Sequence, residues 1–318
     1  MMKTLPTSTP PWLPRQSNSV VRKFLPFIIC VFLSSSCGIL RIKSSEAYLP
    51  GPAIRAEYQP KNIVEEIVQP CSVPGPTERR IIVYLPADYY QSNRRYPVLY
   101  LLHGARGYET SWIRKGEVYQ TADSLWASGK AQPCIIVMPN MNQYNDDADY
   151  EGGRFKDAFE SIFEMDGVVE SAFMKDVVGL VDSLYRTQAD RAGRAIAGLS
   201  IGGCQTMYLA ANNPEAFGYV GAMSPYVWAI GHPGIAHYRF YGNLRRKINR
   251  QYAQCPPYGY YLYAGDYDMM RPATHKLHVY MNKKGYPHRY FKYPSSHDWV
   301  NGWTEELKDV MQRIFQNP

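Results

Sequence analysis

Short apolar segments separated by polar or turn-forming residues recur along most of the chain. Strands are predicted at Ile63–Val68, Arg80–Leu85, Val98–Leu102, Ile135–Met138, Ala195–Leu199, Tyr219–Met223, Tyr260–Tyr263 and Tyr290–Tyr293. Each segment has strand length and is bounded by Gly, Pro, Asn or Asp. A continuous apolar run such as residues 98–102 is typical of a central parallel strand that is buried on both faces.

Segments with helical spacing lie between several of these strands. Apolar residues recur on one face between Phe173 and Leu184, and similar segments cover Gly202–Ala211, His275–Lys284 and Glu305–Phe315. This alternation predicts an α/β fold, a mostly parallel sheet with helices on both faces, and the two early strands indicate an antiparallel edge. We find no repeat and no second domain, so residues 48–318 are expected to form one domain without a large lid.

The first 47 residues have the pattern of an export segment. Arg22 and Lys23 precede the apolar run Phe24–Leu33, and small residues follow at Ser34–Gly38. A positive flank, a short apolar stretch and a small-residue exit are the parts of a signal peptide. The apolar run is about half as long as a membrane-spanning helix requires. We therefore expect residues 1–47 to be an export signal with a disordered start, and the protein to be secreted or periplasmic.

Six cysteines bear on anchoring and pairing. Cys37 follows three serines and allows a lipid anchor, which would place the protein at the membrane as a surface lipoprotein. Leu33, however, lies one position too far upstream for a good lipobox. The domain itself has four cysteines, Cys71, Cys134, Cys204 and Cys255. In an oxidising compartment they could form disulfides in three different pairings, and free thiols are an equal alternative.

Net charge argues against a nucleic-acid partner. The chain has a formal net charge of +7, but residues 1–47 carry six lysines and arginines against Glu46 alone. The remaining chain therefore has a net charge of only +2, with no basic stripe in its sequence. A nearly neutral body gives little electrostatic reason to bind nucleic acid.

The strongest chemical motif is Gly198-Leu199-Ser200-Ile201-Gly202. It follows a predicted strand and precedes a predicted helix, the setting in which G-x-S-x-G forms a nucleophile elbow. Small residues on both sides of the serine let the strand and the helix approach closely, so that its hydroxyl stands exposed above the sheet. We therefore expect Ser200 to be a nucleophile.

A serine nucleophile requires a base and a carboxylate that orients it, in the chain order serine, acid, histidine. His297 is the preferred base, because it lies between the last predicted strand and the last predicted helix, at the carboxyl edge of the sheet. His232 and His237 are weaker alternatives, and His275 and His278 fall inside a predicted helix.

The acid is expected after the strand at residues 260–263, where two candidates stand close together. Asp266 and Asp268 both follow Gly265, and one turn cannot aim both carboxylates at the same imidazole. The residues alone leave this choice open.

Two backbone N–H groups are expected to hold the oxyanion. Ile201, directly after the serine, supplies the first, and the loop His103-Gly104-Ala105-Arg106-Gly107 supplies the second, with Ala105 as the donor. We expect His103 to shape this loop by packing.

These motifs together resemble the esterase D-like family of α/β-hydrolases. The resemblance covers about residues 62–316 and is carried by Tyr185–Thr187, Asp190–Arg191, Arg194–Ser200, Val83–Pro86, Tyr96–Gly104 and His297–Trp299. That family includes carbohydrate esterase family one (feruloyl and acetylxylan esterases), S-formylglutathione hydrolases, siderophore esterases and mycolyltransferases. The resemblance implies an α/β-hydrolase fold and no cofactor.

The resemblance also settles the acid. In the family the acid usually follows a glycine by three positions, which implies Asp268 rather than Asp266. It likewise implies His297 as the base and the backbones of Ala105 and Ile201 as oxyanion donors. Ile201 stands where methionine is common, without consequence for a backbone donor.

An export signal favours the branch of this family that acts on plant polysaccharide esters, because formylglutathione is cytosolic. Aromatic residues near the proposed site could stack on sugars or phenolic rings, with core packing as the equal alternative; they are Trp112, Tyr226, Trp228 and Trp299. The acidic loop with Asp146, Asp147 and Asp149 is interpreted as solvated rather than as a calcium site, and no metal is expected.

The resulting hypothesis is a secreted serine esterase that removes feruloyl or acetyl groups from a polysaccharide such as xylan. A siderophore or other small-ester esterase and an acyltransferase on the same triad are alternatives. A non-catalytic glycan-binding protein is the alternative from another class. The likeness of fold alone does not choose between them.

Overall fold

The computed structural model describes residues 41–45, 60–72, 78–141, 167, 169–227 and 235–316. Its centre is a twisted nine-stranded sheet in the order β1-β2-β3-β5-β4-β6-β7-β8-β9. Residues 1–40 and 46–47 of the predicted export signal, with Cys37, lie outside the described residues. So do the acidic loop at residues 146–149, Trp228, His232 and the side chain of His237.

The sheet joins an antiparallel edge to a parallel body. β1 (Arg41–Ser45), β2 (Ile63–Pro70), β3 (Glu78–Leu85) and β5 (Ile135–Pro139) pair antiparallel in succession. β4 (Val98–Leu102), β6 (Arg194–Leu199), β7 (Tyr219–Met223), β8 (Gly259–Gly265) and β9 (Arg289–Tyr293) continue the sheet in parallel from β5. The predicted α/β-hydrolase architecture with an antiparallel edge is confirmed.

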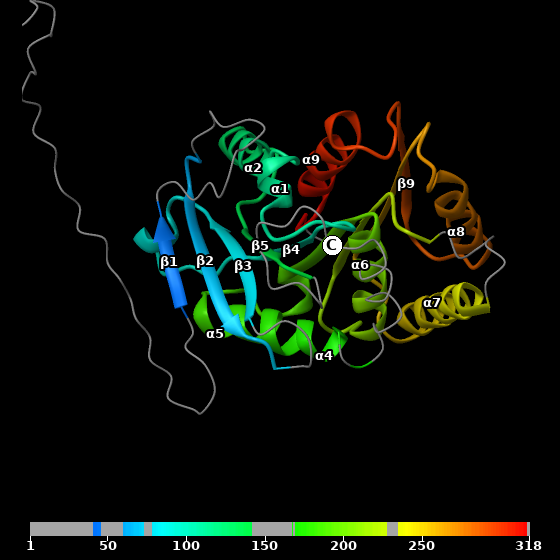
Figure 1. Cartoon of the computed structure of the whole chain (residues 1–318), viewed down its shortest axis with the longest axis horizontal. Helices are drawn as coiled ribbons and strands as arrows, with labels where there is room; N and C mark the ends of the chain where they lie inside the picture. The colour runs from blue at the N-terminus through cyan, green and yellow to red at the C-terminus, as the bar shows by residue number, and fades with distance from the viewer. Residues whose placement is uncertain are drawn as a thin grey trace, which may run out of the picture.

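Helices cover both faces of this sheet (Figure 1). One face carries α1 (Ser111–Arg114), α2 (Val118–Ala127) and α9 (Thr304–Arg313), which follows the π-helical turn η6 (Trp299–Trp303). The other carries the continuous helix of α4 (Glu170–Ala172), η3 (Phe173–Gly179) and α5 (Leu180–Leu184), then α6 (Ile201–Asn212), α7 (Ile235–Gln254) and α8 (Arg271–Lys283). Short 3-10 turns, η1 (Tyr89–Gln91) and η4 (Arg191–Gly193), precede β4 and β6.

The two-residue period of the strands divides the core into two layers. In β4, Val98, Tyr100 and Leu102 pack toward α4–α7, whereas Leu99 and Leu101 pack toward α1, α2 and α9. All five side chains are completely buried. Within the described residues no helix is both long and apolar enough to cross a bilayer.

Two elements differ from the sequence-based expectation. β1 lies within residues 1–47, ahead of the expected domain start at residue 48, and extends the sheet by pairing with β2. α7 was not predicted; Leu244, Ile248 and Tyr252 are buried at every fourth position, which is helical spacing, but polar and basic residues separate them.

α6 approaches β4 so closely that Gly202 has no room for a side chain. A Cβ atom there would lie 2.2 Å from the backbone oxygen of His103 and 2.8 Å from that of Leu102. Neither backbone can move without shifting the strand, since β4 is paired on both sides. The absence of a side chain at Gly202 therefore sets the distance between the serine-bearing turn and the sheet.

We expect Gly202→Ala to lower the free energy of unfolding by about 1–3 kcal/mol, because overpacking forces α6 away from β4. Urea unfolding measures this change. The matched control is Gly179→Ala, an exposed helical position whose Cβ would meet nothing closer than 3.4 Å, and it should be neutral or slightly stabilising. Equal unfolding midpoints for the two variants would contradict the close-approach account.

Candidate active site

Ser200 occupies the sharp turn between β6 and α6. Its backbone angles, φ 53° and ψ −115°, lie in a region that residues with a side chain rarely adopt. The turn is held by a hydrogen bond from the Ser200 N–H to the Met223 carbonyl of β7, at 2.9 Å. The turn is possible because Gly198 and Gly202 have no side chains; a Cβ atom at Gly198 would lie only 2.6 Å from the backbone oxygen of Gly202. This is the nucleophile-elbow geometry that the motif predicts.

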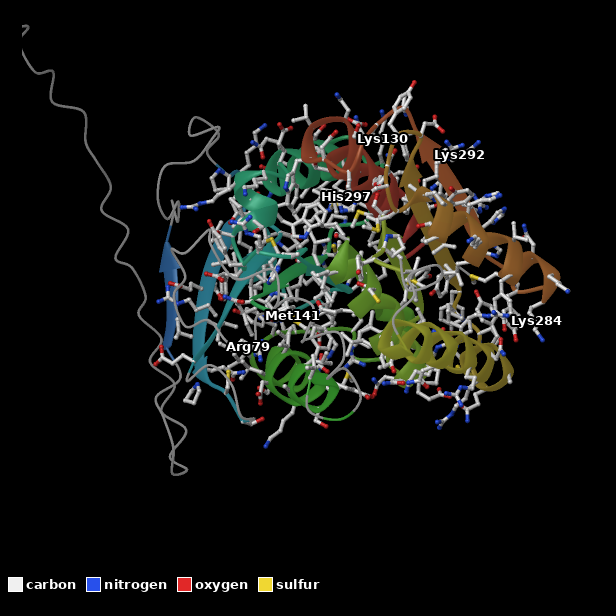
Figure 2. All side chains as sticks on the ribbon, turned by 45° about the vertical axis from the view of Figure 1, so that its right-hand side comes forward. Arg79, Lys130, Met141, Lys284, Lys292 and His297 are labelled. Carbon is white, nitrogen blue, oxygen red and sulfur yellow. The ribbon has the colours of Figure 1, made fainter. Side chains whose placement is uncertain are left out.

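Three loops at the carboxyl edge of the sheet bring Ser200, His297 and Asp268 together. His297 follows β9, and its Nε2 lies 3.0 Å from the Ser200 Oγ. Its Nδ1 lies 3.0 Å from each carboxylate oxygen of Asp268, which follows β8. In Figure 2 the His297 label lies in the upper middle of the molecule, away from both of its ends. The arrangement has the distances that a serine–histidine–aspartate relay requires.

The neighbouring carboxylate, Asp266, points elsewhere. It is partly exposed and forms an ion pair with Arg271, with 3.6 Å between Nη2 and Oδ1. Asp268 is only 4% exposed and accepts a hydrogen bond of 2.7 Å from the Met270 N–H. Of the two candidates that the residues left open, Asp268 is therefore the one at the imidazole.

The surroundings of Asp268 hold it ionised. Burial raises the pKa of this carboxyl, but the hydrogen bond and charge interaction with His297, together with the hydrogen bond from the Met270 N–H, outweigh burial. The net pKa lies below the usual range of aspartate. An anion beside Nδ1 keeps the proton on that nitrogen and leaves Nε2 as a proton acceptor facing Ser200.

A second carboxyl, Glu306 on α9, lies buried in the same region and has the opposite tendency. It is 0% exposed, and neither of its oxygens has a hydrogen-bond partner among the described residues. Burial raises its pKa well above the usual range, and the negative charges of Asp268 and Asp298 raise it further. Its burial and these neighbouring charges therefore favour the neutral form of Glu306, whereas Asp268 is held charged.

The expected oxyanion donors lie on either side of the serine. Ile201 is the first residue of α6, where backbone N–H groups lack partners within the helix. Ala105 packs with Ile201, Cys204 and Tyr226 in one small apolar cluster. The structure thus brings the loop after β4 against the start of α6, as the motif predicts.

His103 holds that loop from beneath. It is 4% exposed, with Nδ1 2.8 Å from the Gly104 carbonyl, and Nε2 accepts a 2.9 Å hydrogen bond from the Met141 N–H. Burial lowers its pKa to about 4, although the hydrogen bond to Gly104 opposes this and the charge of Arg79 adds to it. An imidazole that is neutral near neutral pH, with its proton on Nδ1, ties β4 to the segment that follows β5, in keeping with the expected packing role.

The aromatic residues proposed to bind substrate have different positions. Trp112 is 1% exposed, and its Nε1 donates to the Leu102 carbonyl at 3.0 Å. It therefore cannot present a face to a sugar, and the prediction for Trp112 is corrected to core packing. Tyr226 is half-buried beside the elbow, with its N–H 2.8 Å from the Ser200 carbonyl.

Trp112 instead begins an aromatic stack that ends on the base. Trp299 packs edge-on against both Trp112 and Trp303, with ring centres 5.1 Å apart in each pair. Trp303 packs edge-on against His297 at 4.7 Å. Trp303 was not predicted to lie at the site, although it follows Trp299 by one helical turn.

Cys134, Cys204 and Cys255 are free thiols, and burial raises the pKa of each. In the described part of the chain, no three His, Cys, Asp or Glu side chains converge in a way that would hold a metal ion.

We expect Glu306→Gln to stabilise the protein increasingly as pH rises. At low pH, Glu306 is protonated both folded and unfolded, so the stability difference is smallest. Above the usual carboxyl pKa the unfolded chain releases this proton and the folded chain keeps it, which costs the wild type at most about 1.4 kcal/mol per pH unit. Urea unfolding between about pH 4 and pH 8 tests this, and a pH-independent difference would contradict a neutral Glu306.

The chain is similar in sequence to proteins named as esterases. Residues 74–256 match the family described as "Putative esterase". An endo-1,4-beta-xylanase/feruloyl esterase of Xylanibacter ruminicola is 36% identical over 146 residues, which are 45% of this chain and 19% of that protein. An esterase of Mycobacterium tuberculosis is 32% identical over 133 residues, 41% of this chain and 25% of its own length. The aligned regions cover a third or less of these relatives.

Solved structures share the fold over most of the chain. A ferulic acid esterase superposes with a TM-score of 0.66 and 26% identity, over 80% of this chain and 98% of its own. The ferulic acid esterase of Anaeromyces mucronatus has a TM-score of 0.64 at 22% identity, over 85% and 94% of the two chains. An S-formylglutathione hydrolase of Staphylococcus aureus shares the fold, with a TM-score of 0.57 at 16% identity. The superposition covers 87% of this chain and 99% of that chain. The chain belongs to the esterase family whose model its sequence matches, and it has the α/β-hydrolase fold.

Proposed function

We propose that the chain is a secreted esterase that removes feruloyl or acetyl groups from plant polysaccharides such as xylan, with Ser200, His297 and Asp268 as its catalytic triad. The observation that carries this proposal is the position of His297. Its two ring nitrogens lie 3.0 Å from the Ser200 hydroxyl on one side and 3.0 Å from the Asp268 carboxylate on the other. A relative named as a xylanase/feruloyl esterase and a similarly folded ferulic acid esterase support the substrate class.

In the acylation half, the Ser200 Oγ attacks the ester carbonyl carbon while the His297 Nε2 takes the hydroxyl proton. The carbonyl oxygen becomes an oxyanion that accepts hydrogen bonds from the N–H groups of Ala105 and Ile201. When the tetrahedral intermediate collapses, the C–O bond to the sugar breaks and His297 gives its proton to the leaving sugar oxygen. The acyl group remains on Ser200.

In the deacylation half, His297 takes a proton from water and the resulting hydroxide attacks the acyl carbon. Collapse returns the proton to the Ser200 Oγ and releases the carboxylic acid. In both halves Asp268, ionised by its surroundings, stabilises the imidazolium and keeps the ring oriented.

Exposed apolar side chains flank the two loops that carry the acid and the base. Tyr267 is 79% exposed beside Asp268, and Val300 is 64% exposed beside Trp299. Such surfaces suit a phenolic ring or the apolar face of a sugar next to the reacting ester. Trp299 and Tyr226, both half-buried, are the remaining candidates among the described residues, and Trp228 stays a prediction outside them.

Secretion belongs to the same proposal and depends on residues 1–47. The pattern there, a positive pair followed by an apolar run and small residues, favours export, with Cys37 as the alternative anchor. A plant polysaccharide is an extracellular substrate, so the two parts of the proposal agree.

Release of ferulate and acetate from arabinoxylan by the purified chain tests the reaction. We expect Ser200→Ala to reduce release at least ~10³-fold, because no other group replaces the nucleophile. Ser183→Ala, which removes an exposed hydroxyl on α5, is the control and should keep wild-type activity. Turnover of simple aryl esters without release from the polymer would contradict the polysaccharide assignment and favour small esters as substrates.

The acid is tested by a matched pair of substitutions. We expect Asp268→Asn to lower kcat for methyl ferulate about 10³–10⁴-fold, since an amide cannot stabilise the imidazolium and favours the wrong tautomer. Asp266→Asn removes an equal charge two residues away and should change kcat less than about threefold, because its carboxylate pairs with Arg271 at the surface. Equal losses in the two variants would show that Asp268 has no special role.

A further inference from the structure

Basic residues are concentrated in the segments that form one end of the molecule, α7, α8 and β9 (Figure 1). Residues 243–292 contain two aspartates and ten lysines and arginines, a net charge of +8. The expectation of a body without a basic stripe is therefore corrected, since acidic segments elsewhere reduce the overall charge. The ten are Arg245, Arg246, Lys247, Arg250, Arg271, Lys276, Lys283, Lys284, Arg289 and Lys292.

Part of this charge lines the seam between α7 and α8. Lys276, Tyr280 and Lys283 recur at spacings of four and three residues, which places them on one side of α8. α7 lies along that side, because the Arg245 guanidinium stacks 3.8 Å from the Tyr280 ring centre. The Tyr280 hydroxyl donates a 2.6 Å hydrogen bond to Asn249 of α7. The seam therefore alternates basic, aromatic and amide side chains.

We define the α7–α8 basic face as Arg245, Arg246, Lys276, Lys283 and Lys284. The last four are exposed, and none of these four forms an ion pair with any residue that the structure describes. Figure 2 shows Lys284 at the outer end of the molecule, away from His297. Gathered like charges without carboxylate partners raise the local potential and attract anions from solution.

The position of this face indicates what kind of anion it meets. α8 begins three residues after Asp268, and at 1.5 Å per residue Lys276 and Lys283 lie about 8 and 18 Å along the helix from its first residue. The face is thus outside the reacting site, yet continuous with the loop that carries the acid. Exposed lysines spread over this length suit a repeating polyanion better than one small anion.

We propose that the α7–α8 basic face binds carboxylate groups of uronic acid residues in the polysaccharide whose ester the site cleaves. The inference rests on the proposed function and names a further property of its substrate. Lysine and arginine side chains meet the carboxylates, and the Tyr280 ring and Asn249 amide lie between them for sugar rings and hydroxyls. A polymer held this way reaches the triad with its ester already nearby, whereas a small ester gains nothing from the face.

Affinity electrophoresis in polygalacturonate gels tests the binding. The double variant K276E/K283E changes the face by four charges and is expected to raise the dissociation constant at least ~10-fold at low salt, with binding lost near ~0.5 M salt. The control K130E/K175E makes the same change at two exposed lysines on other elements and should stay within about twofold of the wild type. Carboxyl-reduced polymer should retard none of the proteins.

Equal retardation of the wild type and K276E/K283E would overturn the proposal, as would tighter binding to duplex DNA than to polygalacturonate at the same salt. Methyl ferulate turnover, measured in parallel, separates this inference from the proposed function. All variants should share the wild-type kcat/KM on methyl ferulate. Binding without any ester turnover would contradict the proposed function alone, and turnover without binding would contradict the basic face alone.

Discussion

The close approach of α6 to β4 is the constraint on which the rest of the site depends. With no side chain at Gly202, the first turn of α6 lies against the His103 carbonyl, and Ser200 is forced into a positive-φ turn at the sheet's carboxyl edge. That turn exposes the hydroxyl and aims the free N–H groups of α6 at the same point. The packing of the buried elements β6 and α6 holds Ser200 in this conformation and offsets its backbone strain.

Burial gives three ionisable groups around this turn three different tasks. His103 is kept neutral and fixes the loop after β4. Asp268 is kept charged, because hydrogen bonds to its carboxylate outweigh burial. Glu306, equally buried but without such partners, is kept protonated. Burial keeps His103 neutral, whereas the two carboxyls differ in the hydrogen bonds that they accept, and only Asp268 is held charged.

The sequence pattern predicted those features of the fold and the site that depend on residues close together in the chain. The strands 98–102 and 219–223, the elbow at Ser200 and the loop histidine His297 follow from apolar runs, small residues and chain order. Asp268 required the family resemblance, because two aspartates in one turn differ only in where the folded loop aims them. Trp112 was misassigned, since a sequence shows that an aromatic residue is near a site but not which way its ring faces. The α7–α8 basic face was missed because net charge averages over segments that the fold separates, although the Leu244, Ile248, Tyr252 spacing could have revealed α7.

The central claim is that one serine, activated by His297 and Asp268, carries the acyl group. Labelling of the purified chain with a fluorophosphonate, followed by peptide mass mapping, tests this most directly, because the reagent captures only serines activated by a base. The account predicts one adduct per chain, on Ser200, formed much more slowly in Asp268→Asn than in the wild type. A folded, unlabelled wild-type chain, or an adduct on a different serine, would contradict it.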